Sequence, residues 1–156
     1  MKPDSILKHA AKAFLLAVGA YVLFFSCDSY LRHRRGPWEV TFIASTNGSP
    51  ALLVNHAAYG LTNRLIVFKG EKATNEGTVV FDAPRKTVPF GRTRFEDLTY
   101  LPGGFVLDLF GHEVEFLPRA MFINLQEVSW TTPSPIVLDA SMKVPGLKDR
   151  DRKGRR

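Results

Sequence analysis

The segment GFVLDLFGHEVEFLP, from Gly104 to Pro118, contains the clearest structural signal in this chain. Apolar and polar residues alternate on both sides of Gly111-His112, and such alternation is typical of β-strands with one buried face. A two-residue turn that begins with glycine is typical of a type II′ hairpin. We therefore predict a hairpin here, with its apolar face in the core. The predicted core-facing pairs are Leu109 with Val114 and Leu107 with Phe116.

Three carboxylates lie on the outer face of this predicted hairpin: Asp108, Glu113 and Glu115. In the predicted register Asp108 is opposite Glu115, and like charges that face each other across a sheet are destabilising. A divalent cation such as calcium would compensate them as a metal site. The alternative, which we favour because the spacing matches no known metal-binding loop, is a solvated face neutralised by basic residues of a neighbouring strand. The candidates for that role are Arg92, Arg94 and Lys86.

Short β-rich runs separated by Gly and Pro continue over residues 37–142. Residues 38–56 alternate on both sides of an Asn-Gly turn, which predicts a second hairpin. Further strands are predicted at Arg64–Phe68, Thr78–Asp82, Thr87–Phe90, Phe105–Phe110, Glu113–Leu117, Met121–Asn124 and Ile136–Asp139. Many short strands at turn-marked intervals predict a mainly β domain, either an antiparallel sandwich or an open barrel-like domain.

One apolar segment, AFLLAVGAYVLFFSC from Ala13 to Cys27, precedes this domain. Its fifteen uncharged residues form a helix of about 22 Å, shorter than a hydrocarbon core of about 30 Å. The span lengthens if Lys12 extends its ammonium group outward and Tyr30 lies at the other interface. We therefore predict one N-terminal transmembrane helix, from about Leu7 to Leu31.

Two alternatives for this segment stay open, a cleaved signal peptide and lipid attachment at Cys27. Cleavage needs small residues before the cut, but Phe24-Phe25 occupies the approach to Ser26 and Cys27. The same two phenylalanines depart from the bacterial lipoprotein pattern, which this chain resembles only in Ser26-Cys27. All three interpretations place the domain at or across a membrane.

The net charge of +6 is distributed unevenly and predicts three parts. Residues 1–36 carry six Lys or Arg against two Asp and form a basic lead, an anchor helix and a juxtamembrane arginine cluster. Residues 37–142 carry eight basic against eleven acidic residues and form the β-sandwich-like domain. Residues 143–156 carry seven basic residues against two Asp and form a disordered tail. Because the basic excess lies in the flanks, we expect contact with membrane lipid and none with nucleic acid.

Residues flanking the apolar segment are candidates for the membrane interface. Lysine and arginine bind headgroups, and tyrosine and tryptophan prefer the interface. These candidates are Lys12, Tyr30, Arg32, Arg34, Arg35 and Trp38. Basic residues on the two sides nearly balance, but a short charged lead before a single apolar segment favours an extracytoplasmic domain.

The chain has no catalytic or nucleotide-binding motif that we can defend. Residues 37–142 contain only two histidines, His56 and His112, no Gly-x-Ser-x-Gly elbow and no phosphate-binding glycine loop before a helix. The only cysteine, Cys27, excludes an intrachain disulfide and a cysteine zinc site. We therefore expect no cofactor and a non-catalytic interaction or accessory module at the cell envelope, which binds a protein partner through a sheet face or edge.

Two other functions remain as alternatives. One is a ligand-binding domain for a divalent cation or a glycan. Its aromatic platform would comprise Trp38, Tyr59, Tyr100 and Trp130, although such rings more often pack in a core. The other is an enzyme that resembles a glycosidase or an esterase, and a glycosidase would use Asp108 and Glu115 as its two carboxylates.

Overall fold

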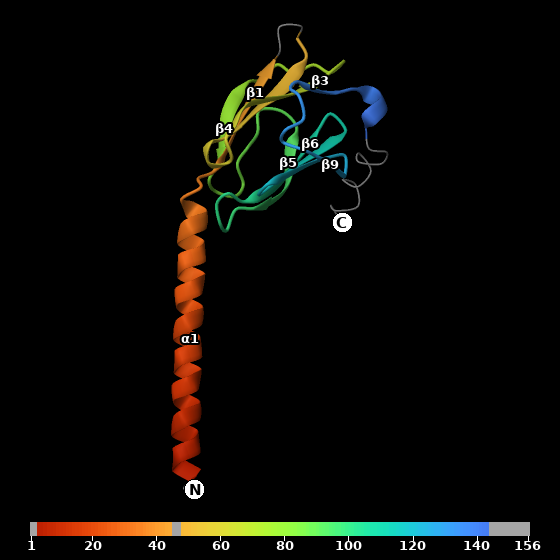
Figure 1. Cartoon of the computed structure of the whole chain (residues 1–156). Helices are drawn as coiled ribbons and strands as arrows, with labels where there is room; N and C mark the ends of the chain where they lie inside the picture. The colour runs from red at the N-terminus through yellow and green to blue at the C-terminus, as the bar shows by residue number, and fades with distance from the viewer. Residues whose placement is uncertain (1–2, 45–47, 144–156) are drawn as a thin grey trace.

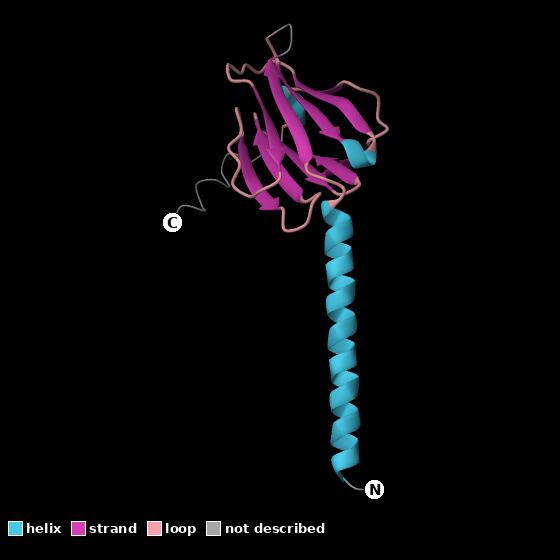
Figure 2. Cartoon of the chain, turned by 90° about the vertical axis from the view of Figure 1, so that its left-hand side faces the viewer, coloured by secondary structure: helices cyan, strands magenta, loops and turns pink. Residues whose placement is uncertain are grey.

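The computed structural model describes residues 3–44 and 48–143, and it consists of one long helix followed by a mainly β domain (Figure 1). Helix α1 extends over Pro3–His33 and projects from one end of the domain (Figure 2). Residues 144–156, which contain nearly all of the predicted tail, lie outside the described residues.

The segment Ile6–His33 of α1 is long and apolar enough to cross a membrane. None of the most apolar stretch of this segment is buried against the domain. A glycine and a proline, Gly36 and Pro37, follow the end of the helix at His33. Gly36 adopts a φ of 76°, and its N–H donates to the carbonyl of His33, as glycine commonly does after the last helical turn. Pro37 cannot continue the helix. The chain therefore turns away from the helix and enters the first strand.

The first sheet contains one parallel and three antiparallel pairings. Its strands are Trp38–Ala44 (β1), Pro50–His56 (β2), Leu61–Phe68 (β3), Gly77–Phe81 (β4) and Ile136–Leu138 (β10). Their spatial order is β10-β3-β2-β1-β4, and only β10 runs parallel to its neighbour, β3. A 3₁₀ turn at Ala57–Tyr59 (η1) connects β2 to β3, and another at Ala140–Met142 (η2) follows β10.

The second sheet is an antiparallel meander. Its strands are Arg92–Asp97 (β5), Gly104–Leu109 (β6), His112–Leu117 (β7), Ala120–Ile123 (β8) and Gln126–Val128 (β9). They lie in chain order, so β5 and β9 are the two edges.

The two sheets pack face to face around one core, to which both contribute buried side chains. The stacked rings of Phe81 on β4 and Phe105 on β6, with centroids 3.9 Å apart, join the sheets at the centre of this core. The prediction of a mainly β sandwich after one apolar helix is confirmed, as is the hairpin over residues 38–56, whose strands pair from Glu39 opposite Asn55 to Ala44 opposite Pro50.

The register of the β6–β7 hairpin differs from the prediction. The turn residues are Phe110 and Gly111, both with positive φ (53° and 87°), which is the pattern of a type I′ turn. Leu107 therefore pairs with Val114 instead of Phe116. Because the register moves by an even number of residues, the core face is unchanged. Asp108 now lies opposite Glu113.

Three other strand predictions need correction. Residues 87–90 are not a strand, and the chain pairs instead at β5, which was not predicted. Strand β9 was also missed. Both missed strands are sheet edges with many exposed positions, so their sequences lack the alternation that marks a half-buried strand.

Candidate functional site in the cleft between strands β4 and β5

A network of ion pairs covers the outer face of the second sheet. The guanidinium of Arg92 donates to Asp108 Oδ2 through Nε (3.1 Å) and Nη2 (2.8 Å). Arg94 Nη2 lies 2.6 Å from Glu113 Oε1, and Arg94 Nη1 lies 3.8 Å from Asp108 Oδ1. Arg92 and Arg94 are two residues apart on β5 and so lie on the same face, and the register of β5 against β6 shifts between Thr93 and Phe95. Two arginines therefore compensate the opposed carboxylates.

In this network the carboxylates lie beneath the guanidinium groups. The side chains of Asp108 and Glu113 are 7% and 6% exposed, whereas those of Arg92 and Arg94 are 44% and 32% exposed. The hydrogen bond with Glu113 raises the pKa of Arg94, which therefore stays charged. The two guanidinium groups and the two carboxylates neutralise each other. A molecule that contacts this face reaches the more exposed guanidinium groups before the carboxylates.

The three carboxylates considered for a metal site, Asp108, Glu113 and Glu115, do not all come together. Glu115 lies opposite Val106, so it does not face Asp108 across the sheet. Within the described residues, no group of three or more His, Cys, Asp or Glu side chains is arranged to hold a metal ion. The pairing of Arg92 and Arg94 with Asp108 and Glu113 follows the favoured expectation, neutralisation by basic residues of a neighbouring strand. The third candidate, Lys86, instead pairs with Asp82 at 2.8 Å.

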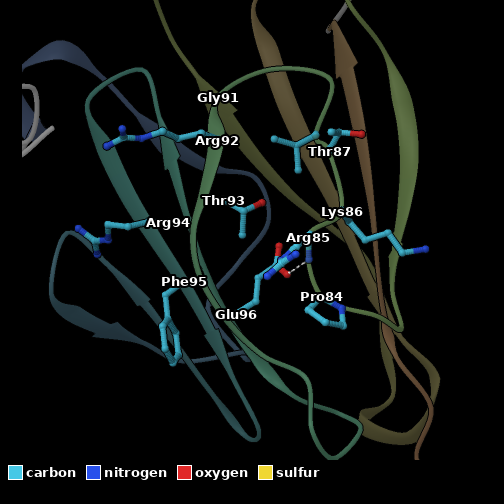
Figure 3. Close-up of a pocket in the computed structure, with 11 residues that line it drawn as sticks. Pro84, Arg85, Lys86, Thr87, Gly91, Arg92, Thr93, Arg94, Phe95 and Glu96 are labelled. Carbon is cyan, nitrogen blue, oxygen red and sulfur yellow. Dashed lines mark hydrogen bonds between the residues drawn. The ribbon is translucent and has the colours of Figure 1, made fainter. Parts of the chain in front are cut away.

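A cleft of about 570 Å³ opens beside this network, between edge strand β5 and the loop that follows edge strand β4 (Figure 3). One wall is β5 and the other is the loop that leads from β4 to β5. The lining residues are Pro84, Arg85, Lys86, Thr87, Val88, Gly91, Arg92, Thr93, Arg94, Phe95 and Glu96. Four of them are basic and one is acidic; Arg85 and Lys86 belong to the loop, whereas Figure 3 shows the side chains of Arg92 and Arg94 pointing away from the loop.

The interior of the cleft is polar and partly pre-arranged. Figure 3 shows Thr93 and Glu96 on the side of β5 that faces the loop, and the backbone N–H of Arg85 donates to the Glu96 carboxylate. The Thr93 hydroxyl is buried and has no hydrogen-bond partner among the described residues. Phe95 points away from the loop and is 58% exposed. An extended polar segment would meet the basic side chains of the loop and the exposed ring of Phe95 here.

Trp38, expected at the membrane interface, is instead a core residue. Its side chain is fully buried, and Nε1 donates to the Gly103 carbonyl at 2.9 Å. Trp130 stacks on it at 5.5 Å and Tyr59 lies at 5.8 Å, so three of the four expected platform aromatics pack in or against the core. The fourth, Tyr100, lies apart beside α1.

The remaining interface candidates lie on α1 or directly after it, and all are exposed. They are Lys12, Tyr30, Arg32, Arg34 and Arg35. Arg32 pairs with Asp28 at 2.9 Å, and the Arg34 guanidinium lies 6.0 Å from the Tyr30 ring centre. Exposure alone does not show contact with lipid. The role of these residues at the membrane interface stays a prediction.

A second groove, of about 470 Å³, opens on the other side of the sandwich between β9 and β10. Its lining is mostly apolar and comprises Ile123, Asn124, Gln126, Val128, Ile136, Val137, Leu138, Met142 and Lys143. Sequence analysis identified neither cleft, because both depend on which strands become edges. The only sequence signal for the first was the basic residues near the predicted hairpin.

The fold and the cleft define a mainly β sandwich domain behind a single helix that is long and apolar enough to cross a membrane. Comparison with known proteins adds no relative to this description: no family model, no curated protein and no solved structure matches the chain. The function must therefore be argued from the site itself.

Proposed function

We propose that this protein is a single-pass membrane-anchored module that binds an acidic, extended segment of a partner protein in the β4–β5 cleft, without catalysis. The domain lies on the extracytoplasmic side, at the cell envelope. The anchor proposal rests on α1, whose large apolar side chains are exposed along the helix. A lipid bilayer would remove this apolar surface from water. The orientation rests on the short charged lead before a single apolar segment.

The observation that carries the binding proposal is the layered charge on the outer face of β5, beside the cleft. The guanidinium groups of Arg92 and Arg94 are partly exposed, while their carboxylate partners lie underneath. Charge-assisted hydrogen bonds to carboxylates are among the strongest that a surface can offer, and arginine presents them in a planar fork. An acidic segment therefore complements this face better than a basic or purely apolar one.

The location at the sheet edge β5 favours an extended partner. An edge strand has unpaired backbone N–H and C=O groups on one side, and proteins use such edges to bind partner segments as an added strand. Arg85 and Thr87 from the loop and Glu96 from β5 then supply side-chain contacts along the segment (Figure 3). The second groove is less suited to an acidic segment because its lining is mainly apolar.

A photo-cross-linking experiment on the full chain in its native membrane tests this proposal. A benzophenone side chain replaces Phe95, which is 58% exposed and lines the cleft, and in a matched variant it replaces Leu125, which is 64% exposed on the far side. We expect cross-links from position 95 that map to an acidic segment of one partner. We expect none of these from position 125.

Charge reversal then tests the basic side chains of the cleft. Arg85→Glu should abolish the cross-link from position 95, because a carboxylate in the cleft repels an acidic segment. Lys72→Glu, the same reversal at an exposed lysine outside the cleft, should leave the cross-link unchanged. Equal cross-linking from positions 95 and 125, or a cross-link that survives Arg85→Glu, would contradict the proposal.

A further inference from the structure

We propose that the β5–β6 loop, residues 98–103, is a second membrane contact, with Tyr100 inserted at the boundary between headgroups and hydrocarbon. This inference rests on the proposed membrane anchor and adds a lipid-binding surface on the β domain itself. The surface consists of the exposed Thr99 and the half-buried Tyr100 and Leu101.

The loop lies against the anchor helix. The Tyr100 ring meets Phe25 edge-on, with centroids 5.7 Å apart, and meets His33 at 6.3 Å. Phe25 and His33 are two helical turns apart, about 12 Å along the axis at 1.5 Å per residue. Tyr100 therefore reaches down the side of α1 well below the end of the helix.

The depth of that contact follows from the charges of α1. A span of about 20 residues, centred on the uncharged stretch Ala13–Cys27, covers roughly residues 10 to 30. Phe25 then lies inside the hydrocarbon boundary, whereas His33 lies among the headgroups. A ring that touches both is at the boundary, where tyrosine is enriched because one end is apolar and the other polar.

The loop is held firmly enough to act as a fixed contact. Leu98 is 9% exposed and belongs to the core, and the carbonyl of Gly103 accepts the indole hydrogen bond of Trp38. Gly103 has no room for a side chain, since a Cβ there would lie 2.7 Å from the Cα of Leu98. A rigid loop and a continuous helix together attach the domain at two points, which sets its tilt on the bilayer.

Nitroxide accessibility on the full chain in phospholipid nanodiscs tests this proposal. One label is attached to the native Cys27, which is exposed on α1. Two others are attached in a Cys27→Ser background at Thr99→Cys, in the loop, and at Thr74→Cys, an equally exposed threonine between β3 and β4 at the opposite end of the sandwich. For each label, the collision rate with oxygen, which concentrates in lipid, is divided by the rate with a polar nickel chelate.

We expect the ratio at position 99 to lie well above that at position 74 and below that at Cys27. Adding Tyr100→Asp should lower the ratio at 99 to that of 74, because a charged side chain at the boundary is costly. A high ratio at Cys27 with equal ratios at 99 and 74 overturns the loop contact alone. Equal ratios at all three positions overturn the anchor as well.

Discussion

Replacing Arg94 with methionine should destabilise the domain by about 3 kcal/mol. The substitution keeps an apolar stem but leaves Glu113, whose side chain is 6% exposed, without its guanidinium partner at 2.6 Å. Removing one partner of a buried ion pair costs about 3–5 kcal/mol. We expect the lower end because Arg94 is 32% exposed and because Arg92 still neutralises Asp108.

Tryptophan fluorescence during denaturant unfolding of the full chain in detergent micelles measures this loss. Both tryptophans, Trp38 and Trp130, lie in the β domain and none lies on α1, so the signal reports the sandwich alone. The double variant with Glu113→Gln should recover part of the loss, because the buried charge is then removed as well. A coupling of about 1–3 kcal/mol between Arg94 and Glu113 is expected for neighbours in one network.

A surface ion pair supplies the matched control. Lys86→Met removes the partner of Asp82, and both side chains of this pair are more than a third exposed. Such pairs contribute about 0–1 kcal/mol. If Arg94→Met costs no more than Lys86→Met, or if the cycle with Glu113→Gln shows no coupling, the reasoning that the carboxylates are buried beneath the arginines is wrong.

Two further predictions concern the core and its histidines. Trp38→Phe should lower the free energy of unfolding through the loss of buried apolar surface. It should cost a further contribution of about 1–3 kcal/mol, because the buried carbonyl of Gly103 loses its hydrogen-bond donor. A loss below about 0.5 kcal/mol is typical of substitutions outside the core and would contradict this prediction. Burial lowers the pKa of both His56 and His112, so the unfolded chain binds more protons than the folded one at acidic pH. Stability should therefore be constant above the ordinary histidine pKa of about 6.5 and fall as the pH drops below it. Melting temperatures from pH 8 to 5 measure this effect, and His112→Asn should reduce the slope; a melting temperature that rises on acidification would refute it.

The sequence predicted those strands whose two faces differ in environment. Strands β1, β6 and β7 each have one face in the core, so their apolar residues alternate and the pattern is visible. Strand β5 reads RTRFED and carries no such pattern, because it is an edge and a bulge interrupts its period. Residues 87–90 have β-prone side chains but belong to the loop beside the cleft. Local composition therefore identified the central strands and the apolar edges β4 and β10, and it missed the two edges of the second sheet, β5 and β9.

The candidate site was predictable only in its chemistry. Arginine compensation of the acidic hairpin followed from residue types, but the choice of partners depended on the turn, which Phe110 and Gly111 shift by adopting positive φ. Trp38 follows the arginine cluster closely in sequence, which suggested a membrane interface. The turn at Gly36-Pro37 instead leads the chain directly into β1, whose first side chain fills the core. Such long-range packing is not visible in a local pattern.

The mass of the mature chain, measured together with its extraction at alkaline pH, tests the anchor most directly. A chain that keeps Met1, or begins at Lys2, and stays in the carbonate-resistant membrane pellet is the predicted result, because an uncleaved α1 spans the bilayer. A chain that begins near Tyr30, or one that is released into the soluble fraction, would contradict the anchor. A chain that begins at Cys27 and carries the added mass of lipid would show a lipid attachment in place of the spanning helix.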